Sequence, residues 1–506
     1  MNIKEAKQYI EESVNMYLTK DKDGDYRIPV VRQRPIFLIG APGIGKTAIM
    51  EQIASELHIA LVSYSMTHHT RQSALGLPFI AHKNYEGMEY DVSEYTMSEI
   101  IASVYDVMAK SGIKEGILFL DEINCVSETL APSMLQFLQY KIFGRHQVPE
   151  GWVIVTAGNP PEYNKSVRDF DIVTLDRMKI IEVEAEYSVW KEYAKSKELH
   201  PAIINFLDIN KEYFYGVETT VKGKNYITAR GWEDLSEMIK LYEENNLLVK
   251  SSLVEQYIRN DKCVREFSAY YELYKKYRST YRIEEILSGN ITDQLTERAS
   301  NAPLDERLSI MGMLIDNICH EIKSNILEAD IIKDVLAPLK AIKQKSEQES
   351  NSEEILSELI KIRDARLEAL NKLENSGAIS SADRKRHKEV IKLLDECLEN
   401  AMKFKADSSK EAFSAVKSVY DSKVNSYKEK TANVKDMLHN AFAFVEKSFE
   451  DGNEMLILMT ELTVIPECVK FITMYGSDDY NRHNQDMMLS KKSDSILKQI
   501  EDIEGL

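Results

Sequence analysis

The sequence is poor in cysteine and has no pair of cysteines at the spacing that holds a metal. Its five cysteines, at positions 125, 263, 319, 397 and 468, are far apart and odd in number. This pattern excludes a disulfide framework and indicates thiols in a reducing compartment. Long apolar runs are missing too, and the charged segment 1–13 lacks the apolar centre of a signal peptide. We therefore expect a cytoplasmic protein without membrane insertion.

An excess of positive charge is also absent. The chain carries 64 Lys and Arg against 82 Asp and Glu, for a net charge of −18. That balance argues against extensive wrapping of nucleic acid or anionic lipid, and it leaves room only for a local basic loop. The hydrophobic share of 43% and the charged share of 29% are those of a folded soluble protein. Since 506 residues are too many for one hydrophobic core, we expect several domains.

Glycine and proline become scarce after residue 231. The first 231 residues hold 14 of the 20 glycines and 9 of the 12 prolines, so the remainder is predicted to be almost entirely helical. In the first half, short apolar runs alternate with amphipathic stretches, a pattern typical of a parallel sheet with crossover helices. The runs that we interpret as buried strands are Ile36–Ile39, Ala60–Ser65, Gly116–Leu120, Trp152–Ala157 and Lys179–Val183.

Two pairs of shorter runs interrupt this alternation. Pro78–His82 and Met88–Val92 flank a turn-rich link, which predicts a β-hairpin. A second, weaker candidate hairpin pairs Tyr140–Phe143 with His146–Val148. We expect both hairpins at the rim of the sheet and not in its core.

A long helical segment is predicted from Ser352 to about Lys447. Apolar residues there recur at steps of three and four among dense charge. A narrow apolar seam with charged flanks predicts a long helical hairpin or coiled coil, although an ordinary multi-helix bundle fits the same spacing. A helix from Lys410 to Glu450 would reach about 60 Å at a rise of about 1.5 Å per residue.

The first motif that carries chemistry directly follows the strand Ile36–Ile39 and precedes an amphipathic stretch. Its spacing is that of a phosphate-binding loop, in which glycines let backbone N–H groups turn toward the phosphates. In this interpretation Lys46 bridges the β- and γ-phosphates of a nucleotide, and Thr47 offers its hydroxyl to Mg²⁺. A chance match in a glycine-rich turn is the alternative, but strand, motif and helix are all present. The motif reads Gly40-Ala41-Pro42-Gly43-Ile44-Gly45-Lys46-Thr47.

Two acids follow the predicted strand Gly116–Leu120. Asp121 is placed to hold Mg²⁺ through its water shell, and Glu122 to polarise an attacking water as general base. Four apolar residues before Asp-Glu are common and mostly structural on their own. Here the pair lies 75 residues after Lys46, beyond two strand–helix units. That placement favours a hydrolysing ATPase of the ring-forming class.

A polar amide, Asn159, follows the next apolar strand, Trp152–Ala157. At the tip of a strand beside the phosphate-binding loop it can orient the attacking water. The alternative is that Asn159 and Pro160 only begin a turn, as Asn-Pro usually does. The fully apolar strand before them favours the functional interpretation.

Taken in order, these motifs resemble those of the MoxR-type AAA+ ATPases. Two later runs complete the resemblance, which covers residues 28–240. They are Leu175-Asp176-Arg177-Met178 and Thr228-Ala229-Arg230-Gly231-Trp232. The sequence departs from the family at Met178, where Phe is frequent, and in Thr-Ala-Arg, where Ser-Pro-Arg is usual.

The resemblance assigns roles to particular residues. It implies that Asn159 is sensor 1, that Arg177 is the finger reaching a neighbouring subunit's γ-phosphate, and that Arg230 is sensor 2. Arg168 lies in the loop just before and is a rival for the finger. The two predicted hairpins match the family's helix-2 insert and pre-sensor-1 insert.

The resemblance also implies a fold and a function. It implies an α/β P-loop AAA+ core followed by a small helical lid. The rest of the chain is then a largely all-α half that contains the helical arm. The activity it implies is Mg²⁺-dependent ATP hydrolysis by a ring of six subunits. Such a ring remodels or matures client proteins and works with a partner that contains a von Willebrand factor A domain. The parts expected are the core at 1–185, the lid at 186–245, a helical region at 246–351, the arm at 352–447 and a C-terminal helical region at 448–506.

Two alternatives remain open at this point. One is a GTP-driven, nucleic-acid-associated translocase subunit resembling the McrB-type restriction GTPases, against which the acidic composition counts. No residue can be named that reads the base, so the sequence does not distinguish ATP from GTP. The other is a scaffold that binds ATP without hydrolysing it, against which Glu122 and Asn159 count.

Overall fold

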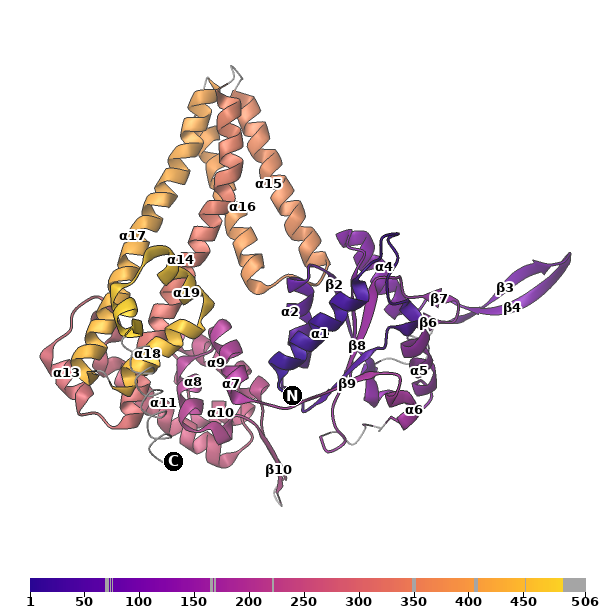
Figure 1. The fold of residues 1–506 in the computed structure, drawn as a ribbon, viewed down its shortest axis with the longest axis horizontal. Helices are drawn as coiled ribbons and strands as arrows, with labels where there is room; N and C mark the ends of the chain where they lie inside the picture. The colour runs from indigo at the N-terminus through magenta and orange to yellow at the C-terminus, as the bar shows by residue number, and fades with distance from the viewer. Residues whose placement is uncertain are drawn as a thin grey trace, which may run out of the picture.

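The computed structural model describes residues 1–68, 72, 74, 76–163, 167, 170–220, 223–347, 352–404, 408–450 and 452–485. A parallel sheet lies at the centre of the N-terminal half (Figure 1). The sequence predicted its strands, and each begins at the expected residue. They are β1 (Ile36–Gly40), β2 (Ala60–Ser65), β5 (Gly116–Asp121), β8 (Trp152–Gly158) and β9 (Lys179–Val183).

The strands lie in the order β2-β5-β8-β1-β9, so β2 and β9 form the edges. Helices cover both faces of the sheet, because successive side chains of a strand point to opposite sides. Ile117 of β5 lies in one apolar cluster and its neighbour Leu118 in another. The first cluster includes α1 (Ile3–Leu18) and α2 (Lys46–Glu56), and the second α4 (Glu99–Ser111) and α5 (Ala131–Tyr140).

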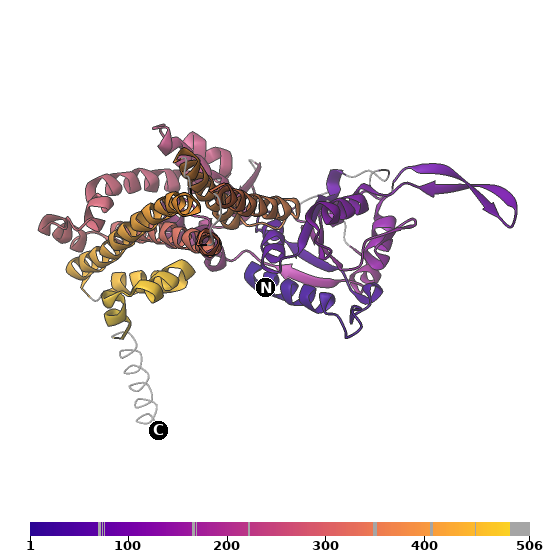
Figure 2. The same cartoon turned by 90° about the horizontal axis from the view of Figure 1, so that it is seen from above.

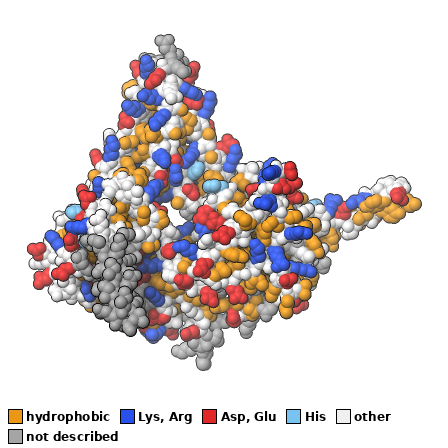
Figure 3. Space-filling model, viewed as in Figure 1, with side chains coloured by type: hydrophobic (Ala, Val, Ile, Leu, Met, Phe, Trp, Pro, Cys, Tyr) orange, Lys and Arg blue, Asp and Glu red, His pale blue; other side chains and the backbone are white. Residues whose placement is uncertain are grey.

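Both predicted hairpins form, and each lies outside the central sheet. The longer one extends away from the core as a two-stranded ribbon (Figures 1 and 2). Hydrophobic side chains gather along its outer end (Figure 3), where Tyr85, Met88 and Tyr90 are exposed. The hairpin strands are β3 (Pro78–Tyr85) with β4 (Met88–Tyr95), and β6 (Ile142–Phe143) with β7 (His146–Gln147).

A helical region follows the sheet, as the scarcity of glycine and proline predicted. Its first helices share one apolar cluster with helices from the end of the chain. A short hairpin, β10 (Gly216–Thr220) and β11 (Gly223–Ile227), precedes α9. The helices are α7 (Tyr187–Ser196), α8 (Pro201–Ile209), α9 (Ala229–Glu244), α10 (Ser251–Tyr257), α11 (Asp261–Tyr281), α12 (Ile283–Leu287), α13 (Asp293–Ser300), α18 (Asn453–Val464) and α19 (Pro466–Tyr475).

Four long helices build the arm that rises in Figure 1. They are α14 (Leu304–Ser346), α15 (Ser352–Asn375), α16 (Ser381–Lys403) and α17 (Ser409–Phe449). The bounds of α17 lie within one residue of the helix predicted from the apolar seam. All four helices contribute to one distal apolar cluster. The arm is therefore a four-helix bundle, which was the alternative, and not the long helical hairpin or coiled coil that we favoured. The reason is that α14, which lies before Ser352, also packs along it.

All five cysteines lie in the described residues, and none of them is joined in a disulfide, as the sequence predicted. Cys319 of α14 and Cys468 of α19 are distant in the sequence, but their Sγ atoms lie 3.5 Å apart. The sequence did not predict this contact. Within the described ranges, none of the helices is both long and apolar enough to span a bilayer.

Candidate active site

The predicted phosphate-binding loop lies between β1 and α2. Gly43 and Gly45 have φ of +76° and +94°, in the left-handed region that glycine adopts without strain. A Cβ on Gly43 would lie 3.3 Å from the Cβ of Thr228. Gly45 directly precedes the first residue of α2, so the loop leads into the positive end of a helix. This backbone geometry suits a chain of phosphates.

Lys46 is buried, with 8% of its surface exposed. Its Nζ donates to the carbonyl oxygens of Gly40 and Ala41, at 2.7 and 2.8 Å, and to Oδ1 of Asn159 at 2.9 Å. Burial lowers the pKa of Lys46 to about 8, and the charge of Asp121 opposes that shift. The ammonium group has three N–H donors and all are used, so Lys46 must exchange partners to hold a phosphate.

Thr47 and Asp121 meet across the loop. The hydroxyl of Thr47 donates to Oδ2 of Asp121 at 3.0 Å. A hydroxyl and a carboxylate are oxygen donors of the kind that Mg²⁺ takes when it also binds substrate phosphates. The two residues therefore fit the metal that the sequence predicted.

Glu122 has an unusual backbone and well-defined contacts. Its φ is +56°, a conformation uncommon outside glycine and found at functional sites when the surroundings hold it. Its carboxylate accepts hydrogen bonds from Ser65 at 3.0 Å and from Thr67 at 2.9 Å. Ser65 is the last residue of β2, the strand beside β5, and Thr67 lies in the short 3-10 helix Met66–His68 that follows. The acid is thus held at the edge where the strand ends meet.

Asn159 lies at the carboxyl end of β8, facing the loop through its bond to Lys46. A buried side chain supports it from behind: Nδ2 of Asn124 donates to the main-chain oxygen of Asn159 at 2.8 Å. A Cβ on Gly158 would lie only 2.5 Å from Oδ1 of Asn124. Glycine is therefore required where these two segments cross.

The start of α9 lies against the same loop. Arg230 is exposed, and its Cβ is 3.4 Å from the position that a Cβ of Gly43 would take. The hydroxyl of Tyr215 donates to the carbonyl of Pro42 at 3.1 Å. Thr228 caps α9 by accepting from the N–H of Gly231 at 3.1 Å, so the unusual Thr-Ala-Arg run begins an ordinary capped helix.

Arg177 lies on the surface between α6 (Ile172–Leu175) and β9. Its Nη1 donates to Oε1 of Gln139 on α5 at 2.6 Å. The structure does not place it among the buried groups around Lys46. The rival arginine, Arg168, lies outside the described residues. The choice between them stays a prediction.

Ser65, Thr67, Asn124 and Tyr215 were missed from the sequence. A signal existed for Ser65 and Thr67, because the polar ends of neighbouring parallel strands gather at one edge of a sheet. Asn124 and Tyr215 had no such local signal, since their partners lie 35 and 173 residues away.

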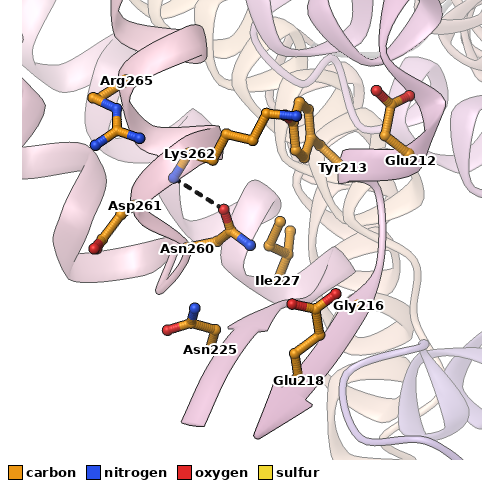
Figure 4. A pocket seen from close by; sticks show the side chains of 10 residues that line it. All are labelled: Glu212, Tyr213, Gly216, Glu218, Asn225, Ile227, Asn260, Asp261, Lys262 and Arg265. Carbon is orange, nitrogen blue, oxygen red and sulfur yellow. Dashed lines mark hydrogen bonds between the residues drawn. The ribbon is translucent and has the colours of Figure 1, made fainter. Parts of the chain in front are cut away.

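A separate cavity of about 460 Å³ opens on the lid between the β10–β11 hairpin and the start of α11 (Figure 4). Glu212 and Glu218 line it together with Lys262 and Arg265. Asn260 caps α11 there, and its Oδ1 accepts from the N–H of Lys262 at 3.1 Å. The lining mixes both signs of charge and includes none of the predicted site residues.

Comparison with known proteins finds a family model that matches part of the chain. Residues 36–174 match the family model described as "ATPase family associated with various cellular activities (AAA)". The match supports an AAA+ ATPase domain, with ATP binding and hydrolysis, and it contains the phosphate-binding loop, both acids and Asn159. A crystal structure of NtrX from Brucella abortus is similar at 16% identity and a TM-score of 0.22, over 37% of this chain and 38% of that one. None of the curated proteins matches the chain.

Nucleotide binding is expected to take up a proton at alkaline pH. The pKa of Lys46 is about 8 because burial disfavours its charge, whereas phosphates beside it favour that charge. Above pH 8 the free protein therefore holds Lys46 mainly neutral and must protonate it on binding. The affinity should fall by up to about tenfold per pH unit over this range. Titration calorimetry at pH 7 and pH 9, in buffers of different ionisation enthalpy, measures the uptake.

Lys141 provides the control for this experiment. It is also buried, with a pKa lowered to about 8, but it binds Gln33 and the carbonyl of Trp152 and not the phosphate-binding loop. The proton uptake should persist in Lys141→Met. Binding heats that are equal in all buffers at pH 9 would contradict the role of Lys46.

Proposed function

We propose that the protein is a MoxR-like AAA+ ATPase that works as a ring, of six subunits, and remodels or matures client proteins. The observation that carries the proposal is the convergence of Lys46, Asp121 and Asn159 at the carboxyl ends of three adjacent strands. Ligands bind at this edge in parallel sheets. Glu122 lies at the same edge and completes a set that can both bind and hydrolyse a nucleoside triphosphate.

Each residue has a separate task in this proposal. The N–H groups of the loop and Lys46 bind the phosphates, and Thr47 and Asp121 hold Mg²⁺. The metal, when bound, neutralises charge on the phosphate oxygens. Glu122 accepts a proton from the attacking water, and Asn159 orients that water. Before hydrolysis, Lys46 must leave Asn159, which then becomes free to bind the water.

The remaining arginines fit a site shared between subunits. Arg230 begins α9 beside the loop and is placed to sense the nucleotide through the lid. Arg177 is exposed, which suits a finger that reaches the site of a neighbouring copy and neutralises charge in the transition state. A von Willebrand factor A domain partner and a protein client are proposed from the MoxR resemblance alone.

A purified-protein assay tests this function. We expect Mg²⁺-dependent hydrolysis of ATP, weak competition by GTP, and no DNA binding that weakens steeply with salt. GTP preferred over ATP, together with salt-sensitive DNA binding, would instead favour the translocase resembling the McrB-type GTPases. Tight ATP binding without any turnover would indicate a scaffold.

The arm offers a test of where partners bind. The hydroxyl of Ser409 donates to the carbonyl of Ser346 at 3.2 Å, so the end of α14 meets the start of α17. Residues 347–408 can therefore be replaced by a short Gly-Ser link, with polar residues at the newly exposed positions of the distal cluster. We expect ATP hydrolysis to remain and the binding of partner or client to weaken, as measured by turnover and by co-purification.

This excision separates the arm from the lid more cleanly than removal of residues 352–447 would. Val434, Leu438 and Phe442 of α17 belong to the apolar cluster around the lid, so the longer deletion would remove part of that core. An excised protein that folds but has lost ATP hydrolysis would show that the arm belongs to the motor.

A further inference from the structure

The turn between α15 and α16 lies on the free edge of the central sheet. The N–H of Leu61, on the edge strand β2, donates to the carbonyl of Ser376 at 2.9 Å. Ser376 is fully buried, and Ala378 is 6% exposed within the same apolar cluster as Leu61. The turn 376–378, which we name the latch, therefore covers a strand edge that would otherwise be open.

Gly377 makes this close approach possible. Its φ is +68°, and a Cβ there would lie 2.8 Å from the carbonyl oxygen of Leu61. That oxygen belongs to the backbone of a paired strand and cannot move aside easily. Any larger residue at position 377 must therefore lift the latch from β2.

The other end of the arm is built into the lid. Leu314 of α14 and Phe442 of α17 share one apolar cluster with Phe206 of α8 and Trp232 of α9. The arm is thus continuous with the lid at its base, while the latch touches the core at β2. Figure 1 shows the resulting triangle: lid, arm and core, with the chain passing directly from core to lid between β9 and α7.

The phosphate-binding loop itself contacts the lid, in addition to a surface ion pair between Lys4 of α1 and Glu192 of α7. Pro42 binds Tyr215, and Gly43 lies against Thr228. Lys46 in the same loop is bound to Asn159 and must leave it to hold a phosphate. A rearrangement of this loop therefore displaces the lid relative to the core. Because the arm also connects the lid to the core, the lid can rotate only if another contact, such as the latch on β2, breaks.

We propose that the latch and nucleotide binding oppose each other. The latch holds lid and core in the arrangement in which Lys46 binds Asn159, and nucleotide binding loosens the latch from β2. Linkage requires the reverse as well, so loosening the latch must tighten nucleotide binding by the same factor. This inference rests on the proposed nucleotide site.

The test uses Gly377→Val and Ala378→Asp in the full chain. Exchange of the Leu61 N–H with deuterium reports the latch directly, and a fluorescent ADP analogue reports affinity. In the native protein we expect the analogue with Mg²⁺ to speed exchange at Leu61. In both variants exchange should be fast without nucleotide, and the Kd should fall by about fivefold or more, the usual lower bound of such coupling.

Gly24→Val is the matched control, because Gly24 has a φ of +95° and open space around it. It carries the same backbone strain without touching the latch, so neither exchange at Leu61 nor Kd should change as in Gly377→Val. The arm excision at 347–408 gives a further variant without a latch.

Three results overturn the inference. If the analogue binds but leaves Leu61 exchange and the variants' Kd unchanged, the latch is a static contact. If the analogue slows exchange and the variants bind it more weakly, the latch supports the bound form and the proposed direction is wrong. If the native protein binds no nucleotide, the proposed function fails too, which separates the two failures.

Discussion

Glu122→Gln is expected to bind ATP normally and to lose about 10²–10⁴-fold in turnover. The amide keeps the size of the side chain and can still meet Ser65 and Thr67, so the site should stay intact. It cannot accept a proton from water, and that step alone should be lost. Lys46→Ala, in contrast, removes the only side-chain cation of the loop and should abolish nucleotide binding. Equilibrium binding and steady-state turnover, measured on the same preparations, separate the two effects.

Glu115→Gln is the matched control for this experiment. Glu115 immediately precedes β5, at the opposite end from Glu122, and it binds Lys20 at 2.7 Å on the surface. The same chemical change there should leave turnover unchanged. Equal turnover in the native protein and in Glu122→Gln would exclude Glu122 as the general base.

The strands could be predicted from the sequence because buried parallel strands are apolar nearly throughout. Each apolar run corresponds to one strand. The motifs at the carboxyl ends of the strands then predict at which edge of the sheet the candidate site lies. The apolar seam located α17 for the same reason, since its helical spacing is a local property of the chain. Asp121 and Asn159 could be singled out because each follows such a run within two residues, and Lys46 because its loop begins directly after Ile36–Ile39.

The remaining features depend on contacts between distant residues. Nothing local shows that Asn124 supports Asn159, or that the turn at Ser376 covers β2. The arm was predicted from Ser352 onward because the apolar positions of α14 serve two clusters, the lid cluster below and the distal cluster above. A helix that packs against different partners along its length has no single apolar stripe in its sequence. The contribution of α14 to the arm therefore could not be predicted.

Mixing two inactive proteins is expected to restore ATP hydrolysis. If Arg177 acts across subunits, each site takes Lys46 and Glu122 from one copy and Arg177 from its neighbour. Lys46→Ala and Arg177→Ala should each be nearly inactive alone. In mixed rings some interfaces pair an intact loop with an intact finger. Loss of a finger costs about 10³–10⁵ in turnover, so even a small recovery rises well above the background.

The binding properties of Arg177→Ala decide how the arginine acts. It should still bind ATP, because a finger acts mainly on charge that develops in the transition state. Gln139→Ala removes the present partner of Arg177 and should leave turnover largely unchanged, since the finger must leave Gln139 to reach another subunit. Arg168→Ala should also lose much less than Arg177→Ala. An inactive Arg168→Ala beside an active Arg177→Ala would reverse the assignment, and no recovery on mixing, under conditions where rings exchange subunits, would contradict a shared site.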